Sequence, residues 1–218
     1  MTVVAILRLF DYAPSGNCLK ARILLAHLGL AYKRVAVDIF GGETLTESFA
    51  VINPARQTPV LEVDGAFLPE SNAILWYLAD GSSYLPADAF GRASVVRWLL
   101  FEQDRVGAIA TLRFRLHVRA LAPGDPVVGQ LRAEAVQAVE LLEADLAERN
   151  FLVGDAYSIA DIANYCYVHV AAEAGVRLDD RPAVQAWLER VEAQSGFVND
   201  LAPLPERARV GRGLSIYG

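Results

Sequence analysis

The chain has 218 residues, of which 54% are hydrophobic and 21% charged, and its formal net charge is −6. This composition is too apolar for a disordered chain, and the acidic balance argues against a nucleic-acid binder, which would carry a basic stripe. Two distant cysteines and three scattered histidines form neither a disulfide framework nor a metal-ligand pattern. The sequence contains no run of roughly 18 apolar residues and no secretory signal, so we expect a cytoplasmic protein without a membrane span.

The first third of the sequence alternates strand and helix signals. Residues 3–10 form an apolar run typical of a buried strand. Residues 18–28 carry apolar side chains at helical spacing, and Gly29 follows them as a helix stop. Residues 32–37 predict a second strand. A strand–helix–strand unit implies a right-handed crossover and a parallel strand pair.

A hairpin is predicted next. Residues 41–55 have the composition of a loop with at most a short helix. Beyond them, apolar runs at 59–63 and 66–68 flank an Asp-Gly dipeptide, which is a strong hairpin signal. A helix is predicted over 72–79. The order β-α-β and then β-β-α predicts a compact α/β domain over residues 1–80.

The remainder of the sequence is typical of an all-α domain, expected over residues 88–218 after a Gly/Ser/Pro-containing linker. Helical periodicity predicts helices over 90–121, 128–149, 158–174 and 183–195. The third is apolar nearly all round, which indicates a central helix. At its start, Ser158 and Asp161 have the spacing of a capping box, a structural rather than a catalytic feature.

Ser15, Asn17 and Cys18 lie between the first strand and the first helix, and they are the candidate catalytic residues. A helix N-terminus offers unpaired N–H groups and a partial positive charge, which stabilise a thiolate. The Ser15 hydroxyl can therefore donate a hydrogen bond to the sulfur of a bound ligand. Alternatively, Ser15 or Asn17 simply caps the helix. The pattern leaves both interpretations open.

Two further segments of the same domain are candidates for ligand binding. A cis bond between Thr58 and Pro59 would leave the N–H and C=O of Val60 free to pair with an extended peptide, whereas a trans proline would merely open an edge strand. Ser71 can cap the helix that follows it, or the same N–H groups can hold a ligand carboxylate. Glu70 can pair with a ligand ammonium group, or it complements the helix dipole.

Together these segments resemble the glutathione S-transferase superfamily, as a bacterial-type member with a serine-type active site. The resemblance rests on Ser-Gly-Asn-Cys-Leu-Lys at 15–20, Asn-Pro-Ala-Arg-Gln-Thr-Pro-Val-Leu at 53–61, Asp-Gly at 64–65 followed by Glu-Ser at 70–71, and Ser-Ile-Ala-Asp-Ile-Ala at 158–163. It implies a thioredoxin-like domain followed by a helical domain, with glutathione as co-substrate. It also implies a small electrophilic second substrate and a homodimer.

The resemblance assigns roles to individual positions. Ser15 matches the serine that activates the glutathione sulfur, with Asn17 and Cys18 as competing candidates. Pro59 matches the cis-proline, and Val60 matches the residue whose backbone pairs with the cysteinyl part of glutathione. The other implied glutathione-binding positions are Arg56, Gln57, Thr58, Glu70 and Ser71.

The second substrate is expected between the domains, where the candidates are Tyr12, Arg105, Ile109 and Arg113. The last three are spaced by four residues and would share one helix face. Its positive charge suits an anionic electrophile or the thiolate. Alternatively, it is an ordinary arginine face exposed to solvent. The tail at 201–218 is expected to cover this cleft.

Two alternative functions stay open at this stage. One is a non-catalytic glutathione-binding or regulatory module on the same fold, because a fold does not fix a function. The other is a glutathione-dependent disulfide reductase or peroxidase. A Cys-x-x-Cys motif is absent from the sequence, which argues against a dithiol oxidoreductase, but a route through the single thiol of Cys18 remains.

Overall fold

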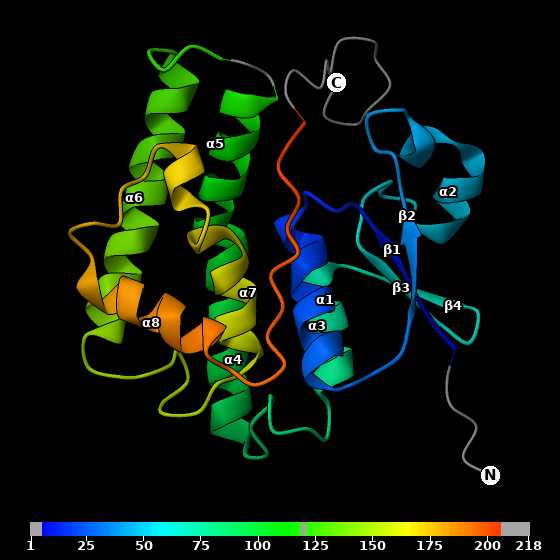
Figure 1. Cartoon of the computed structure of the whole chain (residues 1–218), viewed down its shortest axis with the longest axis horizontal. Coiled ribbons are helices and arrows are strands. Elements are labelled where there is room, and N and C mark those ends of the chain that lie inside the picture. The colour runs from blue at the N-terminus through cyan, green and yellow to red at the C-terminus, as the bar shows by residue number, and fades with distance from the viewer. Residues whose placement is uncertain (1–5, 119–120, 206–218) are drawn as a thin grey trace.

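The computed structural model describes residues 6–118 and 121–205, and it confirms the predicted fold class. A mixed four-stranded sheet with helices forms the N-terminal domain, and the described elements from residue 89 onwards are all helical (Figure 1). None of the described helices has both the length and the apolar character needed to cross a membrane.

The sheet has the strand order β2-β1-β3-β4. Its strands are β1 (Leu7–Asp11), β2 (Lys33–Ala36), β3 (Val60–Val63) and β4 (Ala66–Pro69). β1 and β2 are parallel, as the strand–helix–strand pattern predicts, while β3 runs antiparallel to both β1 and β4. Asp64 and Gly65 connect β3 to β4 with φ values of 49° and 89°, the left-handed pair that a tight hairpin turn requires.

The helices of this domain lie on the two faces of the sheet (Figure 1). α1 (Gly16–His27) and α3 (Ser71–Ala79) pack against each other on the side of the helical domain, while the short η1 (Glu43–Leu45) and α2 (Glu47–Ile52) lie on the other side. α1 begins two residues earlier than the apolar periodicity predicts. The reason is Ser15, whose Oγ accepts a hydrogen bond from the Cys18 N–H at 3.3 Å and so defines the helix start.

The helical domain differs from its prediction in two places. The long helical stretch expected over 90–121 is confirmed over 89–117 as α4 (Ala89–Phe101) and α5 (Gly107–His117), but the sequence did not predict the π-helical turn η2 (Glu102–Val106) between them. Residues 119–120 lie outside the described part of the chain. The helix expected over 158–174 is α7 (Ile159–Val168) followed by a separate 3-10 turn, η3 (Ala171–Ala174). The remaining helices are α6 (Pro126–Leu146) and α8 (Pro182–Glu192). An apolar pattern predicts which residues are buried, and burial alone does not distinguish an α turn from a π turn.

α7 is the central helix of the helical domain, and its start is a capping box, as predicted. The buried Asp161 carboxylate accepts hydrogen bonds from the backbone N–H groups of Ser158 and Leu152, at 3.0 and 2.9 Å, and from the Trp187 indole at 2.9 Å. The carboxylate of Asp161 therefore links the start of α7, the loop at Leu152 and α8. Its role is structural.

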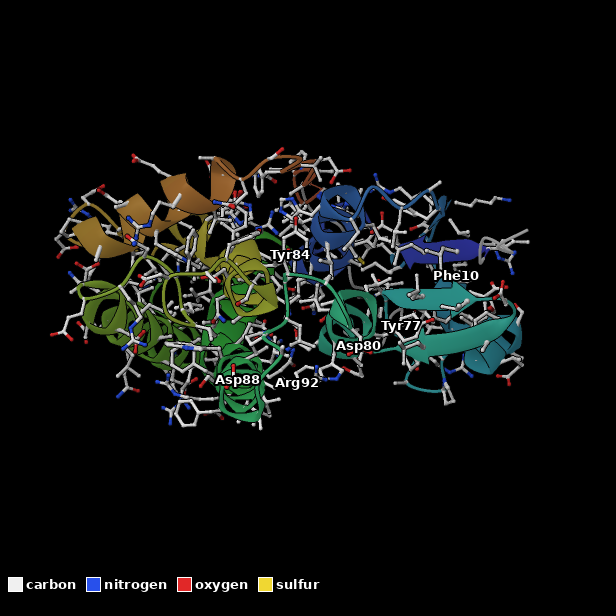
Figure 2. The ribbon with its side chains drawn as sticks, turned by 90° about the horizontal axis from the view of Figure 1, so that it is seen from below. Phe10, Tyr77, Asp80, Tyr84, Asp88 and Arg92 are labelled. Atoms are coloured by element: carbon white, nitrogen blue, oxygen red, sulfur yellow. The ribbon has the colours of Figure 1, made fainter. Side chains whose placement is uncertain are left out.

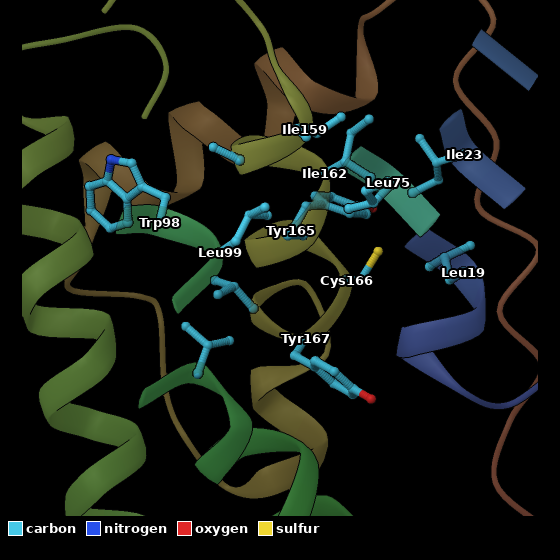
Figure 3. Close-up of a cluster of buried hydrophobic side chains, with 14 of the residues drawn as sticks. Leu19, Ile23, Leu75, Trp98, Leu99, Ile159, Ile162, Tyr165, Cys166 and Tyr167 are labelled. Atoms are coloured by element: carbon cyan, nitrogen blue, oxygen red, sulfur yellow. The ribbon is translucent and has the colours of Figure 1, made fainter. Parts of the chain in front are cut away.

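α7 also packs against α1, which joins the two domains (Figure 3). Gly16 lies at the closest approach, because a Cβ atom there would stand 2.7 Å from both the Cys166 carbonyl oxygen and the Tyr167 ring. A second connection is the segment after α8, which runs along α1 (Figure 1). Its Asp200 accepts a hydrogen bond from Arg22 of α1 at 2.6 Å.

Candidate functional site

A cavity of about 730 Å³ lies between the sheet domain and the helical domain. The sheet domain contributes the β1–α1 loop, part of the β2–α2 connection and the residues before β3, while the helical domain contributes η2, α5 and one residue of α7. Seven of the predicted site residues line this cavity: Tyr12, Ser15, Asn17, Arg56, Gln57, Thr58 and Arg113. Two of the three segments of the sheet domain that were expected to converge therefore meet at this cavity, while Glu70 and Ser71 do not line it.

Ser15 lies at the N-terminus of α1, where it performs the capping function that the sequence left open. Its Oγ accepts the Cys18 N–H, and its own N–H donates to the Tyr12 carbonyl at 2.9 Å. Because the cap uses a lone pair of the oxygen, the hydroxyl proton can still be donated to another group. Capping and thiol activation are therefore compatible at this residue.

Asn17 is held by both domains. Its backbone N–H donates to the Tyr167 hydroxyl at 3.2 Å, and its Oδ1 accepts a hydrogen bond from Ser71 Oγ at 3.3 Å. The side chain is thus fixed at the wall of the cavity. These contacts orient Asn17 but leave its role toward a ligand a prediction.

Cys18 does not fit the predicted role of a reactive thiol. Its side chain is fully buried beneath the cavity wall, and its sulfur accepts the Tyr12 N–H at 3.4 Å. Burial, together with the negative charge of Asp11, raises the pKa of the Cys18 thiol to about 12, although hydrogen bonds from Tyr12, Thr58 and Ser15 oppose the rise. A neutral, inaccessible thiol cannot serve as a nucleophile, so we correct this assignment.

The Thr58–Pro59 peptide bond is cis. Thr58 lines the cavity, whereas Pro59 is buried behind it. The role predicted for Val60 is wrong, because this fully buried residue lies within β3, with β1 on one side of the strand and β4 on the other. Thr58 is the residue of this segment whose position allows contact with a ligand.

The remaining glutathione-binding candidates occupy different environments. Ser71 does not line the cavity, but its hydroxyl donates a hydrogen bond to Asn17, which does. Glu70 is exposed at the start of α3 and lies outside the lining. Arg56 lines the cavity, but its guanidinium donates to the Thr46 carbonyl and to Glu47, each at 2.9 Å. Its side chain therefore supports the loop around it.

The predicted second-substrate face is only partly correct. Ile109 is fully buried in the core, and the exposed Arg105 pairs with Asp104 at 2.8 Å, so neither lines the cavity. The π turn explains the error at Arg105, because it changes the number of residues per turn and the spacing of four no longer defines one face. Tyr12 and Arg113 do line the cavity.

Tyr12 places a neutral phenol in the cavity. Burial and the nearby negative charge of Asp38 together raise the pKa of Tyr12 to about 12, while Arg113 opposes the rise. At neutral pH the phenol is therefore protonated and can donate a hydrogen bond.

Sequence reasoning missed a buried charged pair next to the cavity. Lys20 Nζ lies 2.7 Å from Glu102 Oε2, and both side chains are at most 1% exposed. The lysine also donates to Ser71 Oγ at 3.2 Å and to Asn72 Oδ1 at 3.3 Å. The available signal was a lysine within the apolar pattern of α1, because a buried lysine requires a partner. Within the described part of the chain, no group of three potential ligands could hold a metal ion.

Comparisons with known proteins agree with this arrangement. Residues 5–80 match the model of the glutathione S-transferase N-terminal domain, and residues 108–195 match that of the glutathione S-transferase C-terminal domain. The chain belongs to the glutathione S-transferase family. Glutathione S-transferase 3 of Zea mays is 32% identical over 215 residues, which cover 93% of this chain and 96% of the maize protein.

Solved structures support the same assignment. A glutathione S-transferase from Pseudomonas fluorescens superimposes with a TM-score of 0.87 at 42% identity, covering 90% of this chain and 100% of that one. A glutathione transferase from Burkholderia graminis, solved with two glutathione molecules bound per subunit, superimposes with a TM-score of 0.79 at 33% identity. That alignment covers 90% of this chain and 87% of that one.

Proposed function

We propose that this glutathione S-transferase is a serine-type enzyme that binds glutathione as co-substrate and presents its thiolate to a small electrophile. The observation that carries the proposal is the convergence of Ser15 and Thr58 on one cavity at the N-terminus of α1. A ligand thiol at that position would meet a hydroxyl donor and the positive end of a helix.

The cavity suggests an orientation for glutathione. The backbone of Thr58 replaces that of Val60 as the expected partner of the cysteinyl unit, because Thr58 lines the cavity. Gln57, beside it, is expected to contact the glycyl end. The γ-glutamyl end is expected toward Asn17, behind which Ser71 lies.

Ser15 is proposed to stabilise the thiolate by donating its hydroxyl proton as a hydrogen bond. Lowering a thiol pKa from about 8.5 by two units requires about 2.7 kcal/mol of preferential stabilisation of the charged form. A hydrogen bond to a charged group contributes about 1.5–3 kcal/mol and a helix N-terminus about 0.3–1 kcal/mol. The two effects together are sufficient.

The decisive experiment is the pH–rate profile of conjugation with a generic aryl halide, measured for Ser15→Ala. We expect glutathione binding to persist and the apparent pKa of the rate to rise by about one to two units toward the free-thiol value. Ser15→Thr, which keeps a hydroxyl and a cap, is the matched control and should retain the wild-type profile. Loss of the cap lowers stability by about 1 kcal/mol in Ser15→Ala without moving the kinetic pKa.

Two results would contradict the proposal. An unchanged profile in Ser15→Ala, combined with a shifted profile in Asn17→Ala, would transfer thiol activation to Asn17. Retention of the wild-type protein on immobilised glutathione without turnover of aryl halides, disulfides or peroxides would indicate a non-catalytic binding module instead.

We also propose a homodimer whose contact includes α3 and α4, beside the ion pair of Asp80 with Arg92 (Figure 2). Large apolar side chains are exposed on these helices, including Tyr77 at 50%, Phe90 at 83% and Leu100 at 63%. Exposed apolar surface of this kind is typical of protein–protein contacts. Light scattering should give twice the chain mass, and Leu100→Glu should lower it to that of one chain. The cytoplasmic location stays a prediction.

A further inference from the structure

Arg113 has a hydrogen-bonding capacity that the protein does not use. The residue is 3% exposed and lines the cavity from α5. Its Nε donates to Glu173 at 2.5 Å, and its Nη1 donates to the Pro14 carbonyl at 3.2 Å. Nη2 is shielded from solvent and has no hydrogen-bond partner within the part of the chain that the structure describes. Buried polar groups are almost always paired, so this nitrogen calls for an explanation.

The two partners of Arg113 hold its side chain in place at the cavity wall. Glu173 is on the solvent side, with its side chain 44% exposed, so its negative charge is screened by water. The bond to Pro14 holds the guanidinium next to the loop that carries Ser15. The orientation of Nη2 is therefore set before any ligand arrives, which lowers the entropic cost of binding.

The charge around the cavity favours an anion. Three arginines line it, namely Arg56, Arg113 and Arg115, although the chain as a whole carries a net charge of −6. Of the described residues that line the cavity, Glu102 carries the one carboxylate, and that carboxylate is paired with the buried Lys20. The side chains of the lining therefore include more positive than negative groups, although Arg56 and Arg113 pair with Glu47 and Glu173 outside the lining.

The wall near Arg113 is aromatic. The ring of Tyr12 packs edge-on against Phe40 with centroids 5.7 Å apart, and Phe40 lies nearly parallel to Phe114 at 6.5 Å with an interplanar angle of 11°. All three residues line the cavity. Aromatic faces of this kind pack favourably against a flat aromatic ligand.

We propose that the second substrate of this enzyme is an aromatic electrophile that carries a carboxylate, and that Arg113 binds the carboxylate through Nη2. This inference rests on the proposed function, since it names the substrate class of the same cavity. The carboxylate supplies the missing acceptor for Nη2, and the ring lies against the aromatic wall. Arg113 is then a specificity-determining residue.

The test compares two probes that share their shape and differ in charge: para-chloro-meta-nitrobenzoate and its neutral amide, para-chloro-meta-nitrobenzamide. Binding is measured by calorimetry with S-methylglutathione present, so that no reaction occurs and the result does not depend on turnover. We expect the wild-type protein to bind the benzoate at least tenfold more tightly than the amide. Equal affinities in the wild type would overturn the proposal, even if no Arg113 variant folds.

Variants then assign the preference to one side chain. In Arg113→Gln the preference should fall to about twofold or less through weaker benzoate binding, and Arg113→Lys should restore part of it. Arg149→Gln is the matched control, since Arg149 lies on the surface and pairs with Asp145. Equal loss of both probes in Arg113→Gln would mean that Arg113 only supports the Pro14 loop, which would refute the inference.

Two further measurements separate this inference from the proposed function and from another carboxylate source. If the benzoate preference is present but neither probe is conjugated to glutathione, the transferase proposal fails while the anion site stands. Titration with glutathione alone should saturate at one equivalent per chain. Two equivalents, with the second lost in Arg113→Gln, would assign the carboxylate to a second glutathione and overturn the aromatic substrate class.

Discussion

Replacing Lys20 by methionine tests whether one buried charge holds the cavity wall together. Lys20 Nζ contacts Glu102 Oε2 at 2.7 Å, Ser71 Oγ at 3.2 Å and Asn72 Oδ1 at 3.3 Å, and the lysine side chain is 0% exposed. Methionine has a similar length and fills the same space without charge. The substitution therefore removes the cation and leaves the packing nearly unchanged.

The expected cost of Lys20→Met comes mainly from the carboxylate left behind. Glu102 would keep its hydrogen bonds from Asn72 Nδ2 at 3.0 Å and Gln103 Nε2 at 2.9 Å, but its charge would be buried without a counter-ion. Breaking a buried ion pair in this way costs about 3–5 kcal/mol. For a chain of this size, that loss lowers the melting temperature by about 10 °C.

The assay is equilibrium unfolding in urea, combined with a double-mutant cycle. Lys20→Met with Glu102→Gln removes both charges, so the double variant should recover at least about 1–2 kcal/mol relative to Lys20→Met alone. Glutathione affinity should fall in Lys20→Met, because Ser71 loses the donor that fixes its hydroxyl. A cost below about 1 kcal/mol for Lys20→Met, or a double variant as unstable as the sum of the single variants, would refute the reasoning.

Three further substitutions test other parts of the structure. Ser158→Ala removes the cap of the Ala160 N–H and a donor to Asp161, so we expect a loss of about 1–2 kcal/mol. Burial raises the pKa of Asp161 to about 6, while the hydrogen bonds from Ser158 favour the ionised carboxylate. The loss of unfolding free energy in Ser158→Ala, measured in urea, should therefore be larger above pH 6 than below it. Gly16→Ala should lower the melting temperature and the conjugation rate together, since its Cβ would stand 2.7 Å from backbone and ring atoms across the domain contact. Cys18→Ala should keep the conjugation rate within about threefold, and the native wild-type Cys18 should resist iodoacetamide, because a buried neutral thiol is unreactive.

The sheet domain was predictable from the sequence because its signals are local. The Asp-Gly turn and the apolar runs on either side of it predict β3 and β4, and both turn residues adopt the left-handed φ values that the dipeptide suggests. The convergence of Ser15 with Thr58 was predictable from the resemblance. The assignment to Val60 failed because strand pairing on both sides of β3 is a property of the whole sheet and has no local signature.

The helical half of the site was harder to predict for a different reason. The spacing of Arg105, Ile109 and Arg113 predicts one face only if the helix is regular, and the π turn η2 breaks that condition before α5 begins. The same turn contains Glu102, the partner of Lys20. The geometry of this turn cannot be predicted from apolar periodicity, because burial of Glu102 and Val106 is compatible with an α turn as well as with a π turn.

Two residues of the helical domain that line the cavity, Tyr167 and Arg113, are held by hydrogen bonds with the sheet domain. Tyr167 of α7 accepts the Asn17 N–H, and Arg113 of α5 donates to Pro14. Both contacts end on the loop and helix turn that carry Ser15, so the helical domain supports the segment that carries the proposed thiol-activating residue. A substitution at Arg113 that alters substrate preference would also remove or weaken the hydrogen bond to Pro14, and so affect the loop that carries Ser15. The comparison of charged and neutral probes separates these two effects, since movement of the loop affects both probes and loss of the guanidinium affects one.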